Sequence, residues 1–229
     1  MFSSWSVAST WSKSRVTFHS GTRPRSRDSI SVTIILLAAG EASRMGAGGP
    51  HKLLAEFAGV PLVRRSAERA ISSSADSVTV VTGYRQEEIK AALAGLELNY
   101  VHNPEFASGL ASSLKLGFGA PKSSCADGVL VMLADMPNVT ADHLTILIET
   151  FRSALAQTIV RASSQGKPGN PVILPMSLHQ EVTRLEGDVG ARHIIEACSF
   201  PIIDVAIGSA AALDVDTPEE VIAAGGILK

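Results

Sequence analysis

Short apolar runs alternate with helical patterns along most of the chain, and this alternation limits the fold more than any other feature of the sequence. Strand-like runs occupy residues 32–39, 77–82, 98–101 and 128–133. Helical patterns occupy residues 61–74, 86–95, 108–119 and 140–155. Nearly continuous apolar strands separated by helices are typical of a parallel sheet covered on both faces. The sequence therefore predicts an α/β fold, a Rossmann-like three-layer α/β/α domain with a mostly parallel sheet.

The starts of several helices carry local signals as well. Pro61 stands in a first-turn position, ahead of an apolar stripe made of Leu62, Ala67, Ala70 and Ile71. Thr140 is suited to cap the helix that follows it, and Thr217 begins a last helix with a proline in its first turn. From residue 158 onward the pattern is less regular. There we expect strands at 158–162, 170–174 and 201–206, and helices near 177–185 and 189–197.

Residues 1–31 differ in composition from the rest of the chain. They are rich in Ser and Arg, contain no acidic residue before Asp28, and precede the start of hydrophobic periodicity at Val32. A targeting segment, a disordered tail and an error in the assigned start codon would all give this composition. We expect residues 1–31 to lie outside the fold and residues 32–229 to form a single domain.

Composition excludes several functional classes. The 229 residues are 45% hydrophobic, which is enough to bury the core of one large domain. The net charge of −2 gives no basic field for nucleic acid, and no apolar run approaches the roughly 20 residues of a membrane-spanning helix. The two cysteines, Cys125 and Cys198, form no CxxC motif, so they predict a reducing, cytoplasmic location without a zinc site.

The segment IILLAAGEASRMGAGGPHKLL, residues 34–54, joins the first predicted strand to a glycine-rich loop. Gly40 follows two alanines, so a ligand can approach the main chain there. The loop also carries Arg44 and Lys52. Bare amides together with two cations suit an anion, above all a phosphate. The alternative from these residues alone is a mobile loop whose charges are solvated.

Two common phosphate-binding loops do not match this segment. A P-loop needs GxxxxGK[ST], whereas Gly46 is followed by AGGPHKLL, which lacks both the glycine before the lysine and the hydroxyl after it. The dinucleotide fingerprint GxGxxG is also absent from this loop. Because Lys52 stands 12 positions after Gly40, the loop predicts another kind of nucleotide site.

The motif LLAAGEASRMG…KLL…GVPLV resembles the signature of the MobA-like nucleotidyltransferases, the group that includes the molybdenum cofactor guanylyl- and cytidylyltransferases. The similarity extends from about Val32 to the C-terminus. It implies a nucleotidyltransferase domain in which the nucleotide meets the main chain of Leu37, Ala38, Ala39 and Gly40. It also implies that Arg44 and Lys52 hold the triphosphate and act in catalysis.

Two aspartates are candidate metal ligands. Asp135 stands at the carboxyl tip of the predicted strand 128–133, and Asp216 is expected at the end of another strand, on the same face as Asp214. A buried aspartate is costly unless it is capped or bound to a cation, and a helix or turn cap is the alternative for Asp135. The resemblance implies that Asp135 and Asp216 bind Mg²⁺, with Mn²⁺ as a substitute. Asp214 either supports the metal ligands without binding the metal itself or is a surface residue.

The segment HNPEFASGLASSLKLG resembles the nucleoside-binding motif of the same family. The residues that it implies are Asn103, Gly109, Ser112 and Ser113. Helix capping is the alternative for the two serines. Relatives that use CTP carry LAAG in the first loop and those that use GTP carry LAGG, so Ala39 implies CTP as the substrate.

The acceptor side resembles the cytidylyltransferases in two motifs. Asn170 and Pro171 stand where the family usually has Gly-His-Pro, and an asparagine cannot take over an acid–base role of the histidine. Asp188 and Arg192 match the second motif. Arg192 either holds a phosphate of the acceptor or pairs with Asp188.

These motifs predict an enzyme that transfers CMP from CTP to the phosphate of molybdenum-molybdopterin and releases pyrophosphate. GTP, or another acceptor such as a sugar phosphate, is the nearest alternative. A carrier that binds the molybdenum cofactor without turnover is an alternative of another class, and the missing GxGxxG fingerprint disfavours a dinucleotide-binding oxidoreductase. The expected partners are CTP, the molybdopterin substrate and a molybdoenzyme of the xanthine dehydrogenase type, with neither nucleic acid nor a membrane among them.

Overall fold

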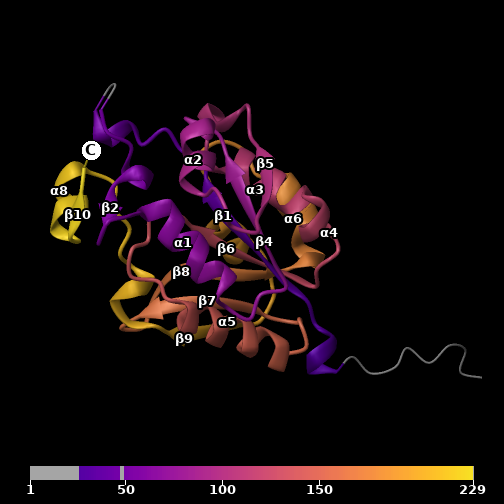
Figure 1. Ribbon diagram of the computed structural model, residues 1–229. Coiled ribbons are helices and arrows are strands. Elements are labelled where there is room, and N and C mark those ends of the chain that lie inside the picture. Colours follow the sequence, from indigo (N-terminus) through magenta and orange to yellow (C-terminus); the bar gives the residue numbers. More distant parts are fainter. Residues whose placement is uncertain (1–25, 47–48, 229) are drawn as a thin grey trace, which may run out of the picture.

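The computed structural model describes residues 26–46 and 49–228, and the expectation for residues 1–25 lies outside these ranges. Figure 1 shows a central sheet with helices on both of its faces. The strand order is β5-β4-β1-β6-β8-β7-β9. The strands are β1 (Val32–Ala38), β4 (Ser77–Thr82), β5 (Asn99–His102), β6 (Gly128–Leu133), β7 (Ile159–Ser164), β8 (Lys167–Pro175) and β9 (Ile202–Ala206). The predicted three-layer class is confirmed.

Strand direction decides which loops meet at one edge of the sheet. β1 is parallel to both of its neighbours, β4 and β6, and β4 is parallel to β5. β8 runs antiparallel to β6 and β7, while β9 is parallel to β7. The carboxyl ends of β1, β4, β5 and β6 therefore lie at one edge, together with the start of β8. In open α/β sheets this is the edge where ligands bind.

The helices lie near their predicted positions, apart from the short α4, which the pattern does not predict. They are α1 (Leu62–Ile71), α2 (Gln86–Ala92), α3 (Leu110–Gly119), α4 (Pro121–Ser124), α5 (Ala141–Ser153), α6 (His179–Thr183), α7 (Ala191–Ala197) and α8 (Pro218–Ala223). Thr140 and Thr217 cap α5 and α8 through capping boxes, so both predicted helix starts are confirmed. The predicted stripe of α1 is wrong at Ile71, which is 40% exposed at the end of the helix. Over the described ranges, every helix is too short or too polar to cross a membrane.

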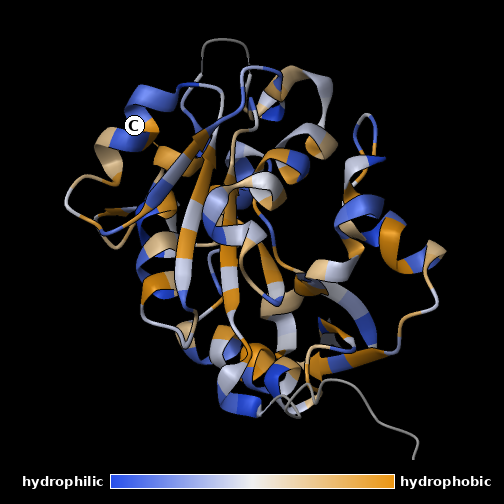
Figure 2. Cartoon of the chain, turned by 90° about the vertical axis from the view of Figure 1, so that its right-hand side faces the viewer, coloured by the Kyte–Doolittle hydropathy of each residue, from blue (hydrophilic) through white to orange (hydrophobic). Residues whose placement is uncertain are grey.

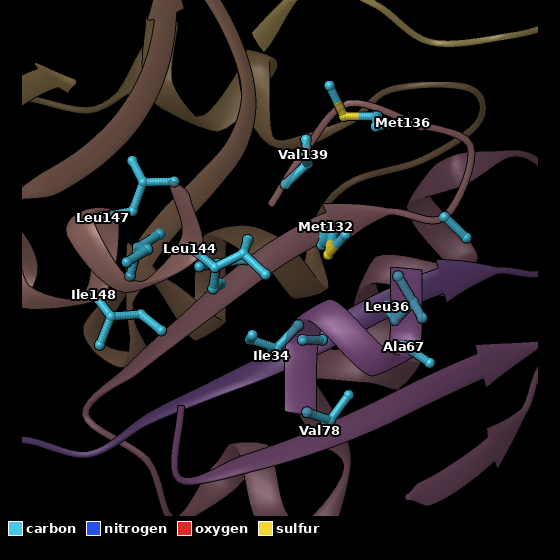
Figure 3. Packing of buried hydrophobic residues seen from close by; sticks show 14 of the residues in the cluster. Ile34, Leu36, Ala67, Val78, Met132, Met136, Val139, Leu144, Leu147 and Ile148 are labelled. Atoms are coloured by element: carbon cyan, nitrogen blue, oxygen red, sulfur yellow. The ribbon is translucent and has the colours of Figure 1, made fainter. Parts of the chain in front are cut away.

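Alternate side chains of β1 face two separate cores, because successive residues of a strand point to opposite faces. Ile34 and Leu36 pack with residues of α1 and α5 on one side, as Figure 3 shows. Ile35 and Leu37 pack with residues of α3, α6 and α7 on the other side. In Figure 2 much of the central strands has hydrophobic colouring, in keeping with the burial of β1 and β6 on both faces. The two cores hold the sheet rigidly between its helices, so the loops at its edge start from fixed positions.

A second, three-stranded sheet has the order β10-β2-β3. Its strands are β2 (Glu56–Phe57), β3 (Val60–Pro61) and β10 (Gly226–Ile227). Strands of two residues are too short to show periodicity, so the sequence pattern does not predict them. Next to this sheet lies a small core that contains Met45, Phe57 and Val215. This core ties the glycine-rich loop to the C-terminal segment.

Residues 26–31 belong to the segment for which the composition predicts no fold. Ile30 is 2% exposed and lies in the larger core. Its carbonyl oxygen accepts a hydrogen bond from Arg152 Nε at 3.0 Å, and Ser31 N–H donates to Asp127 Oδ2 at 3.0 Å. The folded part of the described chain therefore begins before Val32.

Replacing Ile30 with alanine should lower the free energy of unfolding by about 2–5 kcal/mol, because it removes a side chain from a packed core and leaves a cavity. Unfolding in urea measures the difference. Ile222→Ala is the matched control, since Ile222 is 63% exposed on α8 and its truncation should change stability by less than about 0.5 kcal/mol. Equal losses in the two variants would contradict a structural role for Ile30.

Candidate active site

A cleft of about 440 Å³ lies at the carboxyl ends of β1 and β6. Among the residues expected from the sequence, those that line it are Leu37, Ala39, Gly40, Lys52, Gly109, Ser113, Asp135 and Asp188. Sequence reasoning missed the other lining residues, which are Glu41, Ala42, Leu53, Phe106, Ala107, Ser108, Leu110 and Leu133. Most of these are small or apolar neighbours of the motifs, so their residue type alone carries no sign of function.

The glycine-rich loop begins directly after β1. Ala38 packs in the core, whereas Ala39 and Gly40 line the cleft. A Cβ atom on Gly40 would meet no atom within 4 Å, so the main chain faces open space there. The chain then turns through Ala42, which has a positive φ of 52°, into a 3-10 turn at Ser43–Met45. The main chain of the loop is therefore accessible from the cleft at Gly40.

Lys52 lies between two aspartates that are distant from it in the sequence. Its Nζ atom donates hydrogen bonds to Asp135 Oδ2 and to Asp216 Oδ1, both at 2.6 Å. Arg44 pairs with the other carboxylate oxygen of Asp216. These side chains come from the loop after β1, the end of β6 and the segment before α8. The fold thus gathers the two cations and the two acids that the sequence singles out.

Asp214 and Asp216 do not lie on a strand, so this part of the prediction is wrong. Residues 213–216 have no regular secondary structure. Val215 is fully buried between the two aspartates, and its N–H donates to the carbonyl oxygen of Asp135 at 3.1 Å. This main-chain hydrogen bond, rather than strand pairing, places Asp216 beside Asp135. Asp214 is exposed.

The surroundings of the cluster favour a charged lysine. Burial lowers the pKa of Lys52, but the charges and hydrogen bonds of Asp135 and Asp216 outweigh it, so this pKa lies above its ordinary value. Burial raises the pKa of Asp135, against the effect of Lys52. Burial also acts to raise the pKa of Asp216, but Lys52 and Arg44 outweigh it and lower this pKa overall. The lysine therefore stays protonated through the neutral range.

Asn103 is fully buried and acts through its neighbours. Its Nδ2 donates to Ser112 Oγ at 2.8 Å and to Ser113 Oγ at 3.0 Å, and its Oδ1 accepts from the N–H of Glu105 at 2.9 Å. Both N–H donors and the oxygen of this side chain are therefore engaged within the protein. Ser113 lines the cleft, whereas Asn103 and Ser112 line a neighbouring hollow. Asn103 thus positions Ser113 rather than facing the cleft itself.

Gly109 lines the cleft for a reason that differs from the expected approach of a base. A Cβ atom on Gly109 would lie 2.4 Å from the main chain of Gly187. Ala111 N–H donates to the carbonyl oxygen of Gly187 at 3.1 Å, and Asp188 Oδ1 accepts from Leu110 N–H at 3.4 Å. The missing side chain lets the loop around Gly187 close against the start of α3, where it forms one wall of the cleft.

The family of MobA-like NTP transferase domains matches residues 34–202, a range that includes the glycine-rich loop, the nucleoside segment and Asp135. The chain belongs to this family. The resemblance read from the LAAG motif is therefore confirmed, and the protein is a MobA-like nucleotidyltransferase by family and fold.

Individual proteins are similar over nearly the whole of this MobA-like domain. The purine catabolism protein PucB of Bacillus subtilis (strain 168) is 31% identical over 201 residues, which cover 81% of this chain and 92% of PucB. The nicotine blue oxidoreductase of Paenarthrobacter nicotinovorans is 29% identical over 197 residues, which cover 82% of this chain and 94% of that protein. The crystal structure of Rv0371c from Mycobacterium tuberculosis H37Rv in complex with manganese has a TM-score of 0.71 at 21% identity, covering 85% of this chain and 98% of that chain. The last similarity shows the fold alone.

The family to which this chain belongs consists of NTP transferase domains, and the acidic residues of this cleft would fit a divalent ion. Asp135 Oδ1 is buried and has no hydrogen-bond partner in the described part of the chain. Asp135 and Asp216 both accept a hydrogen bond from the ammonium group of Lys52, so the two carboxylates lie next to the same positive charge. Within the described ranges, no group of three or more His, Cys, Asp and Glu side chains could hold a metal. Because one or two carboxylates completed by phosphate oxygens suit Mg²⁺, the ion would bind together with the nucleotide.

The expected acceptor residues of the MobA-like domain are divided between two hollows. Asn170 and Arg192 line a separate hollow of about 300 Å³, whereas Asp188 lines the main cleft. Pro171 is buried in β8. Arg192 pairs with Glu196 at 2.7 Å rather than with Asp188, so the alternative pairing drawn from the sequence is not formed.

His51 is a residue of the site that sequence reasoning missed. Its ring is 3% exposed beside Lys52 and makes hydrogen bonds to Gly40 and Leu53. A single histidine in a glycine-rich loop has no partner at metal-ligand spacing, so the sequence carries no signal for its role. Only the folded loop brings this ring against Gly40.

Proposed function

We propose that this protein transfers CMP from CTP to the phosphate of molybdenum-molybdopterin and releases pyrophosphate. The observation that carries the proposal is Lys52, held between Asp135 and Asp216 beside a cleft that exposes the main chain of Ala39 and Gly40. An ammonium group and two acids next to bare amides suit a metal-bound nucleoside triphosphate. The product would serve molybdoenzymes of the xanthine dehydrogenase type in the cytoplasm.

The proposed reaction is a displacement at phosphorus. A phosphate oxygen of the acceptor forms a bond to the α-phosphorus of CTP, and the bond from that phosphorus to the bridging oxygen of the β-phosphate breaks. Lys52 neutralises charge that develops on the α-phosphate, and Arg44 holds the outer phosphates. Asp135 and Asp216 would hold Mg²⁺, which supplies further neutralisation of phosphate charge when bound. Positioning of the two substrates contributes the rest, so no covalent nucleophile is needed.

Two measurements test the proposal. Thermal unfolding in Mg²⁺ with CTP, GTP, ATP and UTP in turn shows which NTP protects the protein, and we expect the largest shift with CTP. Pyrophosphate release is then measured with the protecting NTP and with either the molybdenum cofactor or a sugar phosphate as acceptor. Release that requires CTP and the molybdenum cofactor supports the proposal. Protection by none of the four NTPs would overturn it.

Two functions of other classes give different results in the same assays. A carrier of the molybdenum cofactor would bind the cofactor without releasing pyrophosphate, and the pairing of Lys52 with two acids disfavours it because carriage needs no metal site. The similarity to a nicotine blue oxidoreductase favours hydride transfer as a second candidate. Oxidation of NADH or NADPH by the purified protein would support that candidate, against the missing GxGxxG fingerprint.

Ala39→Gly should raise the use of GTP relative to CTP. Ala39 lines the cleft and is 3% exposed. The methyl group of Ala39 lies so close to Gly83 that a Cβ atom on Gly83 would be 2.9 Å from it. Removing the methyl leaves room that a larger purine base could use. A methyl group in a pocket is worth roughly 1–3 kcal/mol of discrimination, so the preference should change by at most about 10- to 200-fold. The measurement is the ratio of kcat/KM for GTP and CTP with one acceptor, and an unchanged ratio would place base selection elsewhere.

A further inference from the structure

The ring of His51 is buried beside the cleft, next to Gly40, Lys52 and Leu53, which line it, and the proposed reaction does not use this ring. Its Nε2 lies 3.2 Å from the carbonyl oxygen of Gly40, and its Nδ1 accepts a hydrogen bond from Leu53 N–H at 3.2 Å. Since Nδ1 accepts, a neutral ring carries its proton on Nε2 and donates it to Gly40. One side chain therefore joins the start of the glycine-rich loop to the turn that carries Lys52.

In the described part of the loop, no other hydrogen bond joins Gly40 directly to the turn that carries Lys52, although Arg44 and Lys52 also share Asp216. The main-chain hydrogen bonds there are local, such as Met45 N–H to Ala42 and Leu54 N–H to His51. Across residues 26–46 and 49–228, the hydrogen bonds of the His51 ring are the only ones found that join Gly40 to residues 49–54. The imidazole thus joins Gly40 to the segment that carries Lys52.

The bond to Gly40 also orients the next amide. In a trans peptide the C=O and the following N–H point in opposite directions, so the Glu41 N–H is turned away from the His51 ring. In the described ranges, this N–H has no hydrogen-bond partner, and Glu41 lines the cleft. An unpaired amide of this kind is suited to a phosphate oxygen.

The ring of His51 is itself held in place from behind. It stacks on Tyr84 with a centroid distance of 5.8 Å and an interplanar angle of 24°. Tyr84 N–H donates to the carbonyl oxygen of Ala39 at 3.0 Å, and its ring lies 6.0 Å from that of Phe106, which lines the cleft. The imidazole therefore belongs to a packed unit that runs from the main chain of the loop to a wall of the cleft.

We propose that His51 is a positioning residue whose neutral ring sets the spacing between the main chain at Gly40 and the ammonium group of Lys52. This inference rests on the proposed function, because that spacing matters only if both groups hold one nucleotide. A protonated ring would place an N–H at Nδ1 against the N–H of Leu53 and would lose that bond. The loop would then open, and the phosphates would lose either the amides or the lysine.

The groups around His51 keep its ring neutral near pH 7. Burial is the largest effect and lowers the pKa of His51, whereas the hydrogen bond to the main chain of Gly40 raises it. The positive charges of Arg85 and Lys52 also lower this pKa, and the negative charge of Glu88 raises it. Tyr84 is the other titratable side chain packed against the ring. Just below the ordinary value of 6.5, the unfolded chain binds a proton that the folded ring does not, so His51 makes stability rise with pH through this window. Turnover should fall at still lower pH, where the folded ring is protonated.

Three variants separate the two hydrogen bonds of the ring. The amide of His51→Gln can still donate to Gly40, His51→Asn can still accept from Leu53, and His51→Leu can do neither. We expect kcat/KM for the nucleotide to fall about 10- to 100-fold in His51→Leu, and less in the two amide variants. The loss of activity on the acid side that is due to His51 should disappear in all three.

His143→Gln is the matched control, because His143 closes the capping box of α5 and glutamine can close it as well. Its pH profile should equal that of the wild type. If CTP protects the wild type and His51→Leu equally and the acid-side loss remains, the positioning role is wrong while the proposed function stands. If no NTP protects the wild type, both fail. If His51→Leu does not fold, His51→Gln provides the test. The inference is overturned if the activity of His51→Gln falls at low pH as much as that of the wild type does.

Discussion

Lys52→Met should lower kcat about 10²- to 10³-fold and leave the fold in place. The ammonium group is held at 2.6 Å from both Asp135 and Asp216, and the proposed reaction needs this charge at the α-phosphate. Methionine has a similar length and no charge, so it removes the electrostatic contribution while filling most of the space. Pyrophosphate release under saturating substrate measures kcat. Lys90→Met is the control, because Lys90 lies on α2 and pairs with the exposed Glu87.

The same substitution should change the response of the protein to metal. Without the ammonium group, the carboxylates of Asp135 and Asp216 repel each other and burial makes their charge costly, so Tm in the absence of metal should fall. Mn²⁺ should then raise Tm more in Lys52→Met than in the wild type, because in the variant the metal alone neutralises the two carboxylates. Equal shifts would show that the charge of Lys52 does not contribute to neutralising these carboxylates. A kcat near that of the wild type would remove Lys52 from the mechanism.

The strands and helix starts could be predicted because their causes are local. β1 and β6 are buried on both faces, and this leaves unbroken apolar runs in the sequence. Thr140 and Thr217 bond to residues within their own helices. Strand direction has no such local cause. An apolar run such as β8 has the same sequence pattern whether the strand lies parallel or antiparallel to its neighbour. The direction of β8 depends on the turn that joins it to β7, whose Gln165 and Gly166 both have positive φ.

In the candidate site, too, features with a local cause could be predicted and features that depend on tertiary contacts could not. Asp135 and Gly40 could be placed because each is the second residue after a strand whose carboxyl end lies at the cleft. Asp216 reaches the site through one hydrogen bond from Val215 to Asp135, which no periodicity encodes. Asn103 has the side chain of a ligand-binding residue, yet it is buried, and burial depends on the packing of α3 against the sheet. Residue type therefore predicts a chemistry for the cleft, while tertiary contacts decide which side chains face it.

Asp135→Asn should abolish metal-dependent binding of the nucleotide while the fold survives. Asparagine has nearly the same shape as aspartate, but its uncharged amide is a poor ligand for Mg²⁺ in place of the buried, unpartnered Oδ1. Loss of the metal removes several kcal/mol of transition-state stabilisation, so turnover should fall about 10³-fold or more. Folding should tolerate the change, because the burial that raises the pKa of Asp135 no longer acts on a charge.

Asp214→Asn is the matched control for this variant. Asp214 is exposed, but its charge contributes to raising the pKa of Asp135, so the substitution changes the charge near the site without removing a proposed ligand. Binding of Mn²⁺ in the presence of CTP, followed by electron paramagnetic resonance, should be kept in Asp214→Asn and lost in Asp135→Asn. Wild-type affinity in Asp135→Asn would exclude Asp135 as a ligand. Equal losses in the two variants would mean that the negative charge of the region, rather than coordination by Asp135, attracts the ion.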